Sequence, residues 1–264
     1  MGRHRYQELT ADGAAIFDRR IRDVLGKNYK LQAELPDAVS GEAFLGAVKN
    51  QLAYGSCSAE SGCGVVEALW KKTYNTNITL SPMCLYEEER ILSTAAIGGS
   101  IWQDTGERLL VTELALMKFG VCLERDDPYI AADFVRNLDP LLAEAATYRI
   151  HSGYWAPSLN EILNALALGY FVQIGIQVYP SFESPAVEKS GIVPMPTAQD
   201  LASGPLGGHA LVAYGYNKQK QYVEVRNSWG DDWGLKGNCR IPFRYFVDPY
   251  LTSARVYTLA PITA

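Results

Sequence analysis

Residues 51–57 read Gln-Leu-Ala-Tyr-Gly-Ser-Cys, which sets a carboxamide six residues before a thiol. Two segments much further along the chain, Gly207-Gly208-His209-Ala210 and Asn227-Ser228-Trp229-Gly230, add an imidazole and a second carboxamide. In that order the four groups are an oxyanion donor, a nucleophile, a base and a residue that orients the base. These are the parts needed to cleave an amide through a thioester. Because His209 lies 152 residues after Cys57, only a folded chain can bring them together.

The thiol of Cys57 is the predicted nucleophile, and its reactivity depends on its ionisation. The thiolate is the attacking species, whereas a thiol of ordinary pKa is mostly protonated at neutral pH. A helix predicted over residues 56–72 places Cys57 at a helix N-terminus, whose partial positive charge favours the anion. An imidazolium at His209 would act in the same direction. We therefore expect a lowered pKa for this thiol.

Gln51 and His209 are predicted to stabilise the oxyanion and to act as the base. Gln51 is expected to donate its side-chain amide to the developing oxyanion, beside the backbone N–H of Cys57. The two glycines before His209 permit the close backbone approach that a cleft requires. The other two histidines, His4 and His151, have no comparable surroundings.

Asn227 begins the most specific segment of the chain. Residues 227–237 read Asn-Ser-Trp-Gly-Asp-Asp-Trp-Gly-Leu-Lys-Gly. Asn227 is expected to accept a hydrogen bond from the His209 ring and to hold the tautomer that faces Cys57. Trp229 is expected to shield that hydrogen bond from water.

Composition and charge narrow the class of protein. The chain has 264 residues, 48% of them hydrophobic and 20% charged, which is typical of a globular protein with a sizeable core. The net charge of −5 shows no basic surplus, so we expect no nucleic-acid partner. No apolar run is long enough to span a bilayer, and residues 1–13 are polar. We therefore expect neither a membrane partner nor a classical signal peptide.

The five cysteines, Cys57, Cys63, Cys84, Cys122 and Cys239, form no compact disulfide or zinc pattern. With Cys57 as the nucleophile, two disulfides remain arithmetically possible. We interpret the other four as buried thiols in a cytoplasmic or other reducing compartment. We expect no metal and no cofactor.

Hydrophobic patterning divides the chain into a mainly helical half, 35–147, and a mainly antiparallel β half, 148–260, which is an α+β fold. Helices are predicted over residues 56–72, 80–91, within 105–120, and over 158–168 with Ser158 as the cap. Strands are predicted over residues 171–179, 209–216, 222–227, 238–242 and 254–259. Residues 180–205, rich in Pro, Ser and Gly, are predicted to form a long surface loop.

At these residues the chain resembles the papain-like cysteine peptidases. The resemblance covers about residues 35–260, and within the family the chain is most similar to a short bacterial or phage branch. It implies a two-domain fold, with a helical left domain, an antiparallel β right domain and an active-site cleft between them. It also implies an endopeptidase that hydrolyses peptide bonds through a Cys57 acyl-enzyme.

The resemblance further implies where a peptide or protein substrate binds. Gly106 is similar to the glycine-rich edge that holds an extended substrate backbone in the family. The residues implied for the pocket and its surroundings are Gly175, Ile176, Gln177, Gly208, Ala210 and Trp229.

Three positions depart from the family pattern. Secreted relatives usually carry a cysteine three residues before the nucleophile, where this chain has Tyr54. Ser58 replaces a tryptophan, and Glu60 replaces an aromatic residue. A carboxylate at residue 60 favours the helix N-terminus but opposes a nearby thiolate, so we expect it to point away or to be paired.

Residues 1–34 precede the region of resemblance, and two interpretations remain open. They are a surface arm, or they are a short prosegment that crosses the cleft and inhibits the enzyme intramolecularly. An aminopeptidase or peptide-processing hydrolase is an alternative function, because the arm could block one end of the cleft. A catalytically silent binding protein is the other alternative, and the retention of all four catalytic residues argues against it.

Overall fold

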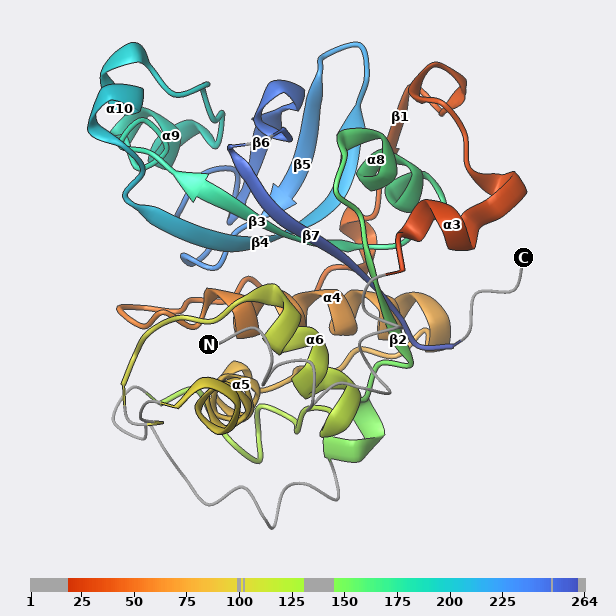
Figure 1. Cartoon of the computed structure of the whole chain (residues 1–264), viewed down its shortest axis with the longest axis vertical. Coiled ribbons are helices and arrows are strands. Elements are labelled where there is room, and N and C mark those ends of the chain that lie inside the picture. Colours follow the sequence, from red (N-terminus) through yellow and green to blue (C-terminus); the bar gives the residue numbers. More distant parts are fainter. Residues whose placement is uncertain (1–18, 99–100, 102, 131–144, 248, 261–264) are drawn as a thin grey trace.

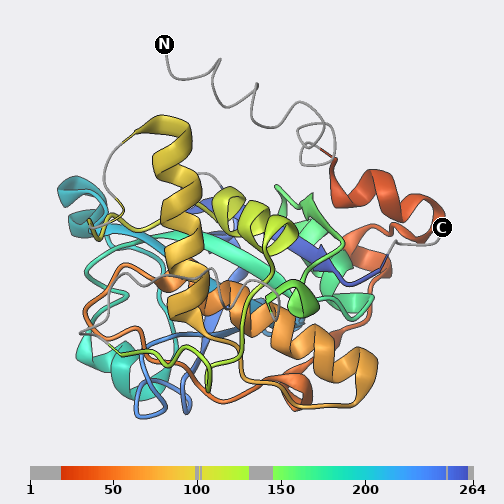
Figure 2. The same cartoon turned by 90° about the horizontal axis from the view of Figure 1, so that it is seen from below.

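The structure, a computed structural model, describes residues 19–98, 101, 103–130, 145–247 and 249–260. It consists of two stacked halves, a β-sheet in the upper half of the view and helices in the lower half (Figure 1). The view from below shows the helices crossing beneath the sheet (Figure 2). This arrangement is the predicted α+β fold.

The lower half is built from the helices α4 (Cys57–Tyr74), α5 (Pro82–Ile97) and α6 (Leu109–Lys118). α5 begins where the Ser81 side chain accepts a hydrogen bond from the Cys84 N–H, with Pro82 in the first turn. α4 ends at Asn75, whose φ of 52° lies in the left-handed region. The sequence predicts all three helices, and α5 runs six residues beyond its predicted end.

The upper half contains a seven-stranded antiparallel sheet in the order β2-β7-β3-β4-β5-β6, with β1 paired to β4. The strands are β1 (Ala38–Ser40), β2 (Ser152–Trp155), β3 (Val172–Val178), β4 (Gly207–Asn217), β5 (Tyr222–Arg226), β6 (Asn238–Pro242) and β7 (Leu251–Thr258). The five predicted strands correspond to β3 through β7. The two short strands β1 and β2 were not predicted, because runs of three or four residues carry too little alternation to recognise.

The β half also carries the helices α8 (Leu159–Ala167), α9 (Pro185–Ser190) and α10 (Ala198–Ser203). Ser158 caps α8 by accepting a hydrogen bond from the Glu161 N–H, as predicted. α9 and α10 lie within residues 180–205, so the prediction of a long loop there is wrong. Ser184 caps α9, and Thr197 and Asp200 form a capping box on α10. These caps stabilise two helices in a segment whose Pro, Ser and Gly content predicts a loop.

Short 3-10 turns complete the described structure: Gly26–Asn28, Gln32–Glu34, Glu42–Phe44, Ala146–Tyr148 and Phe243–Tyr245. Among the described residues, every helix is too short or too polar to cross a membrane.

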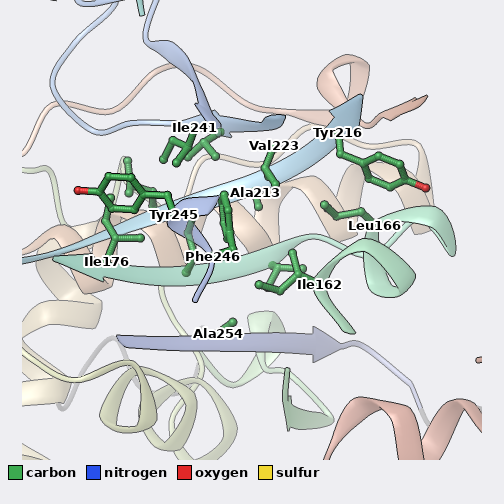
Figure 3. Packing of buried hydrophobic residues seen from close by; sticks show 14 of the residues in the cluster. Ile162, Leu166, Ile176, Ala213, Tyr216, Val223, Ile241, Tyr245, Phe246 and Ala254 are labelled. Carbon is green, nitrogen blue, oxygen red and sulfur yellow. The ribbon is translucent and has the colours of Figure 1, made fainter. Parts of the chain in front are cut away.

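Two hydrophobic clusters fill the molecule. The first lies within the β half and includes Ile162 of α8, Ile176 of β3 and Phe246 (Figure 3). The second joins α4, α5 and α6 to β4. At this interface a Cβ on Gly62 of α4 would come within 2.6 Å of the Thr112 Cγ2 on α6, so only glycine permits this packing. α4 therefore lies where the two halves meet.

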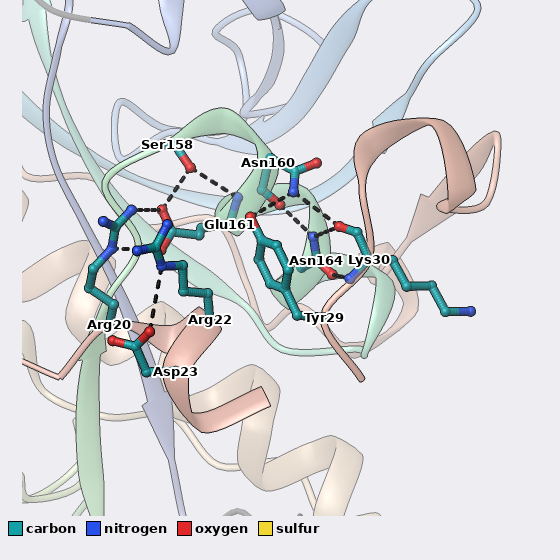
Figure 4. A network of polar contacts seen from close by, with 9 residues as sticks. All are labelled: Arg20, Arg22, Asp23, Tyr29, Lys30, Ser158, Asn160, Glu161 and Asn164. Atoms are coloured by element: carbon teal, nitrogen blue, oxygen red, sulfur yellow. Dashed lines mark hydrogen bonds and ion pairs between the residues drawn. The ribbon is translucent and has the colours of Figure 1, made fainter. Parts of the chain in front are cut away.

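The described part of the N-terminal segment packs on the β half (Figure 4). Its helix α3 (Ile21–Leu25) buries both of its terminal apolar side chains in the core of that half. Arg20 donates two hydrogen bonds, of 2.9 and 2.8 Å, to the fully buried carboxylate of Glu161 on α8. The Asn164 side chain bonds both backbone groups of Lys30. From residue 19 onward the segment is thus part of the folded β half, and α3 lies at the end of the molecule away from α9 and α10 (Figure 1).

Candidate active site

Cys57 is the first residue of α4 and is half-buried. The backbone N–H of Ala210, on β4, forms a hydrogen bond with its thiol. The loop before it is held by Tyr129, whose hydroxyl lies 2.6 Å from the Ser56 Oγ and donates to the Gln51 carbonyl at 3.0 Å. The nucleophile position thus combines a helix N-terminus with a backbone donor, and both favour a thiolate.

The His209 ring is held between Asn227 and Trp229. Its Nε2 lies 2.7 Å from the Asn227 Oδ1, and that oxygen also accepts a hydrogen bond from the Ser228 N–H. The Trp229 ring stacks on the imidazole, with centroids 4.8 Å apart and planes 23° apart. Because Nε2 is engaged, Nδ1 is the ring nitrogen left to exchange a proton with the thiol.

The Gln51 carboxamide is fixed at both ends. Its Nε2 donates to the Tyr54 carbonyl at 2.8 Å, and its Oε1 accepts from the Ser228 Oγ at 2.8 Å. A carboxamide carries two N–H bonds, so one remains for an oxyanion. The next residue, Leu52, has a φ of 54°, a strained conformation of the kind found at functional sites. The loop therefore presents a preorganised donor beside Cys57.

These groups line one cleft between the halves, with a volume of about 1380 Å³. The structure brings Gln51, Cys57 and His209 together there, and Asn227 contacts His209 from behind. Of the predicted substrate-binding residues, four line the cleft: Gly106, Gly175, Gly208 and Ala210. The prediction for the other three differs from what the structure shows.

Ile176, Gln177 and Trp229 lie away from the cleft lining. Side chains alternate across a strand, so Gly175 faces the cleft while Ile176 points into the β-half core and is fully buried. Gln177 lies further along β3, where its carbonyl accepts from Tyr245. Trp229 packs behind His209 and against two other aromatic rings. It therefore covers the base instead of lining the pocket.

Comparison with known proteins settles the family. The model of the papain family cysteine proteases matches residues 34–245.

The chain belongs to the papain family.

Sequence relatives of this papain-family chain come from viruses and eukaryotes. An uncharacterized peptidase C1-like protein of Acanthamoeba polyphaga mimivirus is 31% identical over 211 residues, which are 75% of this chain and 65% of that protein. A cathepsin L-like proteinase of Fasciola hepatica is 26% identical over 232 residues, or 84% of this chain and 66% of that protein. The chain thus spans slightly less than two thirds of the length of these relatives.

Solved structures share the papain fold. Xylellain, a cysteine protease from Xylella fastidiosa, superposes with a TM-score of 0.78 at 22% identity, covering 94% of this chain and 92% of that one. Digestive procathepsin L 3 of Tenebrio molitor has a TM-score of 0.67 at 21% identity, covering 95% and 79% respectively. The two-domain papain architecture predicted from the sequence is therefore confirmed.

In this papain-family site, burial acts against ionisation of both catalytic groups. It raises the pKa of the Cys57 thiol to about 11, although the Ala210 N–H lowers it. It lowers the pKa of the His209 imidazole to about 4, although the Asn227 hydrogen bond raises it. Desolvation therefore opposes the lowered thiol pKa that the helix N-terminus and the backbone donor favour. The low pKa of the imidazole leaves His209 able to act as a base.

Glu60, one turn into α4, is neither turned away nor paired. It is 2% exposed, and neither carboxyl oxygen has a hydrogen-bond partner among the described residues. Burial raises its pKa to about 8, although nearby Lys49 lowers it. Lys49 instead makes its ion pair with Glu67, at 2.8 Å. Glu60 is therefore mostly protonated at pH 7, so it opposes a thiolate less than an ionised carboxylate would.

We expect this buried carboxyl to make the protein less stable as the pH rises. A folded pKa of about 8 exceeds the unfolded pKa near 4.5, so between these values the folded state binds more protons. The free energy of unfolding should then fall, by at most about 1.4 kcal/mol per pH unit from this group. Glu60→Gln should flatten the decline between pH 5 and pH 8 in urea unfolding followed by tryptophan fluorescence. An equally steep decline in Glu60→Gln would show that Glu60 contributes nothing to it.

Removal of the Gln51 amide should slow catalysis more than it weakens substrate binding. The donor is most effective once negative charge has developed, so Gln51→Ala should lower kcat by about 10²-fold or more with little change in KM. Ser228→Ala, which removes only the contact to the Gln51 Oε1, should cost less. Steady-state kinetics on a fluorogenic peptide measure both. A change confined to KM would make Gln51 a substrate-binding residue instead.

The five cysteines are free thiols. Two of them, Cys84 and Cys122, lie with Asp127 so that their possible ligand atoms are all within 4.8 Å of one another, buried and away from the cleft. This grouping offers three ligands where zinc usually takes four, and Asp127 has further contacts of its own. The hydrogen bond between the two thiols and burial raise the pKa of Cys84, so Cys84 packs as a neutral thiol.

Four residues that support the site were not predicted to do so from the sequence. Asp104, Tyr86, Ser228 and Tyr129 each hold a part of the cleft through side-chain hydrogen bonds. Asp104 stands two residues before Gly106, so the sequence alone places it near the edge predicted to hold the substrate backbone. Its partners come from distant segments and could only be found in the fold.

Proposed function

We propose that this chain is a papain-like cysteine endopeptidase. The observation that carries the proposal is that the Cys57 thiol, the His209 base and the Gln51 amide line one cleft, with Asn227 bonded to His209. The cleft runs between the two halves, and no described residue of the segment 19–34 lines it. A cleft that is not closed by this segment fits cleavage within a chain better than removal of a terminal residue.

Acylation uses each group in turn. The Cys57 sulfur attacks the carbonyl carbon of the substrate, and its proton passes to the His209 Nδ1. The carbonyl oxygen becomes an oxyanion that accepts hydrogen bonds from the Cys57 backbone N–H and the free N–H of Gln51. The C–N bond then breaks, His209 gives the proton to the leaving amine, and a thioester remains on Cys57.

Deacylation repeats these steps with water. His209 takes a proton from water, whose oxygen attacks the thioester carbonyl and regenerates the oxyanion. The C–S bond breaks, the acid product leaves, and the proton returns to sulfur. Asn227 keeps the imidazole in one orientation throughout, because its Oδ1 holds Nε2 in both halves of the reaction.

Peptides blocked at both ends distinguish the functions. An endopeptidase cleaves an acetylated and amidated peptide internally, and mass spectrometry of the products gives the bond. An aminopeptidase, the alternative function, requires a free N-terminus and leaves such a peptide intact. A silent binding protein cleaves neither blocked nor free peptides. Internal cleavage that is lost in Cys57→Ala is the result we expect.

We also propose that residues 1–18, which lie outside the described residues, slow substrate entry. The support is indirect: digestive procathepsin L 3 and the ragweed allergen Amb a 11, the latter solved in its proform, share this fold. The remainder of the predicted arm, residues 19–34, packs on the β half, including α8. Inhibition by the arm would therefore come from its first part.

Two truncations distinguish an effect of the arm on activity from its contribution to stability. Deletion of residues 1–18 should raise kcat/KM on small peptides and leave the unfolding midpoint unchanged. Deletion of 1–34 should also remove Ile21, Leu25 and the partner of buried Glu161, and should lower the free energy of unfolding by at least about 3 kcal/mol. An unchanged kcat/KM after deletion of 1–18 would make those residues a tail.

Two further assignments remain proposals. A reducing compartment is supported by the five free thiols. The short bacterial or phage branch has limited support, because the sequence relatives reported above are viral and eukaryotic, and xylellain, which is bacterial, shares the fold at 22% identity.

A further inference from the structure

We propose that Asp104 is a positioning residue, which ties the loop of the nucleophile to the neighbouring Gly106 edge on the helical side of the cleft. The proposal rests on the proposed peptidase function and concerns the same site. Asp104 does not belong to the catalytic set predicted from the sequence, and within the described part of the chain it forms no hydrogen bond with Cys57 or His209. Its role would be to fix the distance between the thiol and the edge that holds the substrate backbone.

The hydrogen bonds of Asp104 join three segments of the helical half. Both carboxylate oxygens accept from the Gly55 N–H, at 2.9 and 3.0 Å, two residues before the nucleophile. The Tyr86 hydroxyl, on α5, donates to the Asp104 Oδ1 at 2.5 Å. The same hydroxyl accepts from the Gly106 N–H at 3.1 Å. One carboxylate and one phenol thereby connect the nucleophile loop and the Gly106 edge to α5.

The nucleophile loop and the Gly106 edge are also in direct contact. A Cβ on Gly55 would lie 2.9 Å from the Asp104 Oδ1 and 3.0 Å from the Gly106 N, so only glycine permits this approach. Gly106 itself has a φ of 65°, which favours glycine. The backbone of the nucleophile loop is thus seated against the backbone of the substrate edge, with Asp104 as the connection between them.

α5 anchors this loop at a second point. Arg90 is 2% exposed, and its guanidinium donates to the Ile101 carbonyl at 2.7 Å while lying over the Tyr86 ring. Burial and the Asp104 carboxylate raise the pKa of the Tyr86 hydroxyl, which therefore stays protonated and donates. Ile101, Asp104 and Gly106 are consequently each anchored to α5, and Asp104 joins the nucleophile loop to them.

The network requires a carboxylate. The Gly55 N–H reaches both oxygens and the Tyr86 hydroxyl donates to Oδ1, so both oxygens of Asp104 act as acceptors. Asparagine has nearly the same shape, but its Nδ2 would face either the Gly55 N–H or the Tyr86 hydroxyl. Phenylalanine at residue 86 leaves Asp104 in place and removes the connection to α5. A misplacement of catalytic groups by about 1 Å can cost on the order of 10²-fold in rate.

The test compares Asp104→Asn, Tyr86→Phe and their double variant, with Glu183→Gln as a control for loss of an exposed carboxylate. We expect each single variant to lower kcat/KM on a doubly blocked peptide by about 10- to 100-fold, and to slow alkylation of Cys57 by iodoacetamide. Because the two residues share one network, the double variant should be little worse than the poorer single variant. Glu183→Gln should match the wild type.

Two controls distinguish the possible outcomes: thermal unfolding of each variant and cleavage of the same peptide by the wild-type protein. If kcat/KM and the alkylation rate of a variant equal the wild-type values at temperatures below its unfolding transition, the role is purely structural and the proposal is overturned. A wild-type kcat/KM in Asp104→Asn, or strictly additive effects in the double variant, would also overturn it. If the wild-type protein fails to cleave the peptide, the proposed peptidase function itself is overturned. That result involves no substitution at Asp104, so it is distinguishable from failure of the Asp104 proposal.

Discussion

Cys57→Ala is expected to abolish peptide hydrolysis, with kcat at least about 10⁴-fold below that of the wild type. The acyl-enzyme cannot form without the sulfur, and no other described cysteine lines the cleft. The fold should survive, because Cys57 is half-buried at a helix N-terminus and alanine is a good helix former. The measurement is single-turnover kinetics on a fluorogenic peptide, with circular dichroism as the check on folding.

Cys63→Ala is the matched control for this experiment. Cys63 lies on the same helix but is fully buried in the core of the helical half. Its replacement should lower stability through a cavity and leave kcat of the folded protein nearly unchanged. Hydrolysis at the wild-type rate in Cys57→Ala would eliminate Cys57 as the nucleophile.

His209→Ala is expected to be nearly as severe as loss of the thiol, and Asn227→Ala is expected to be milder. Burial holds the pKa of His209 at about 4, so the neutral ring is available as a base at neutral pH, and the described cleft lining contains no second imidazole. Asn227 orients that ring through one hydrogen bond of 2.7 Å, and Trp229 still packs on the ring when the bond is lost. Orienting groups usually contribute less than the nucleophile and base.

The order of these two effects is the informative result. Both variants should be compared in kcat and in KM at a pH where the wild type is fully active. A larger loss of kcat in Asn227→Ala than in His209→Ala would contradict the assignment of base and orienting residue. Thermal unfolding serves as the control, since the Asn227 Oδ1 also accepts from a backbone N–H and its loss affects the local fold.

The helices and the longer strands could be predicted because local signals agree with tertiary packing. α4, α5 and α8 have apolar periodicity and recognisable starts, and β3 to β7 alternate over five residues or more. The composition of the segment that contains α9 and α10 predicts a loop, whereas the caps at Ser184 and Thr197 begin helices. Local capping chemistry was the better guide there, since a cap satisfies the unpaired N–H groups of even a short helix.

The candidate site was predicted only as far as its motifs reach. Gln51, Cys57, His209 and Asn227 stand in recognisable segments. The resemblance implies Ile176 in the pocket together with Gly175, but adjacent residues of a strand face opposite ways. Strand direction is a property of the folded sheet, so a linear stretch such as 175–177 cannot all face one cleft.

Electrostatics were the least predictable part of the site. The sequence places a helix N-terminus and an imidazole beside Cys57, which alone would lower the thiol pKa. The degree of burial, which dominates the pKa values of Cys57, His209 and Glu60, follows from packing of distant segments. The Asp104 connection between the nucleophile loop and the Gly106 edge has the same origin, because its partners lie on α5 and on the nucleophile loop.

Labelling with an epoxide inhibitor of the papain type tests the central claim most directly. The protein is titrated with the epoxide, the remaining peptidase activity is followed, and digestion with mass spectrometry locates the adduct. The account predicts one equivalent bound at Cys57, loss of activity in proportion to labelling, and neither labelling nor activity in Cys57→Ala. Full peptidase activity with Cys57 completely modified, or inactivation by an adduct at another residue, would contradict it.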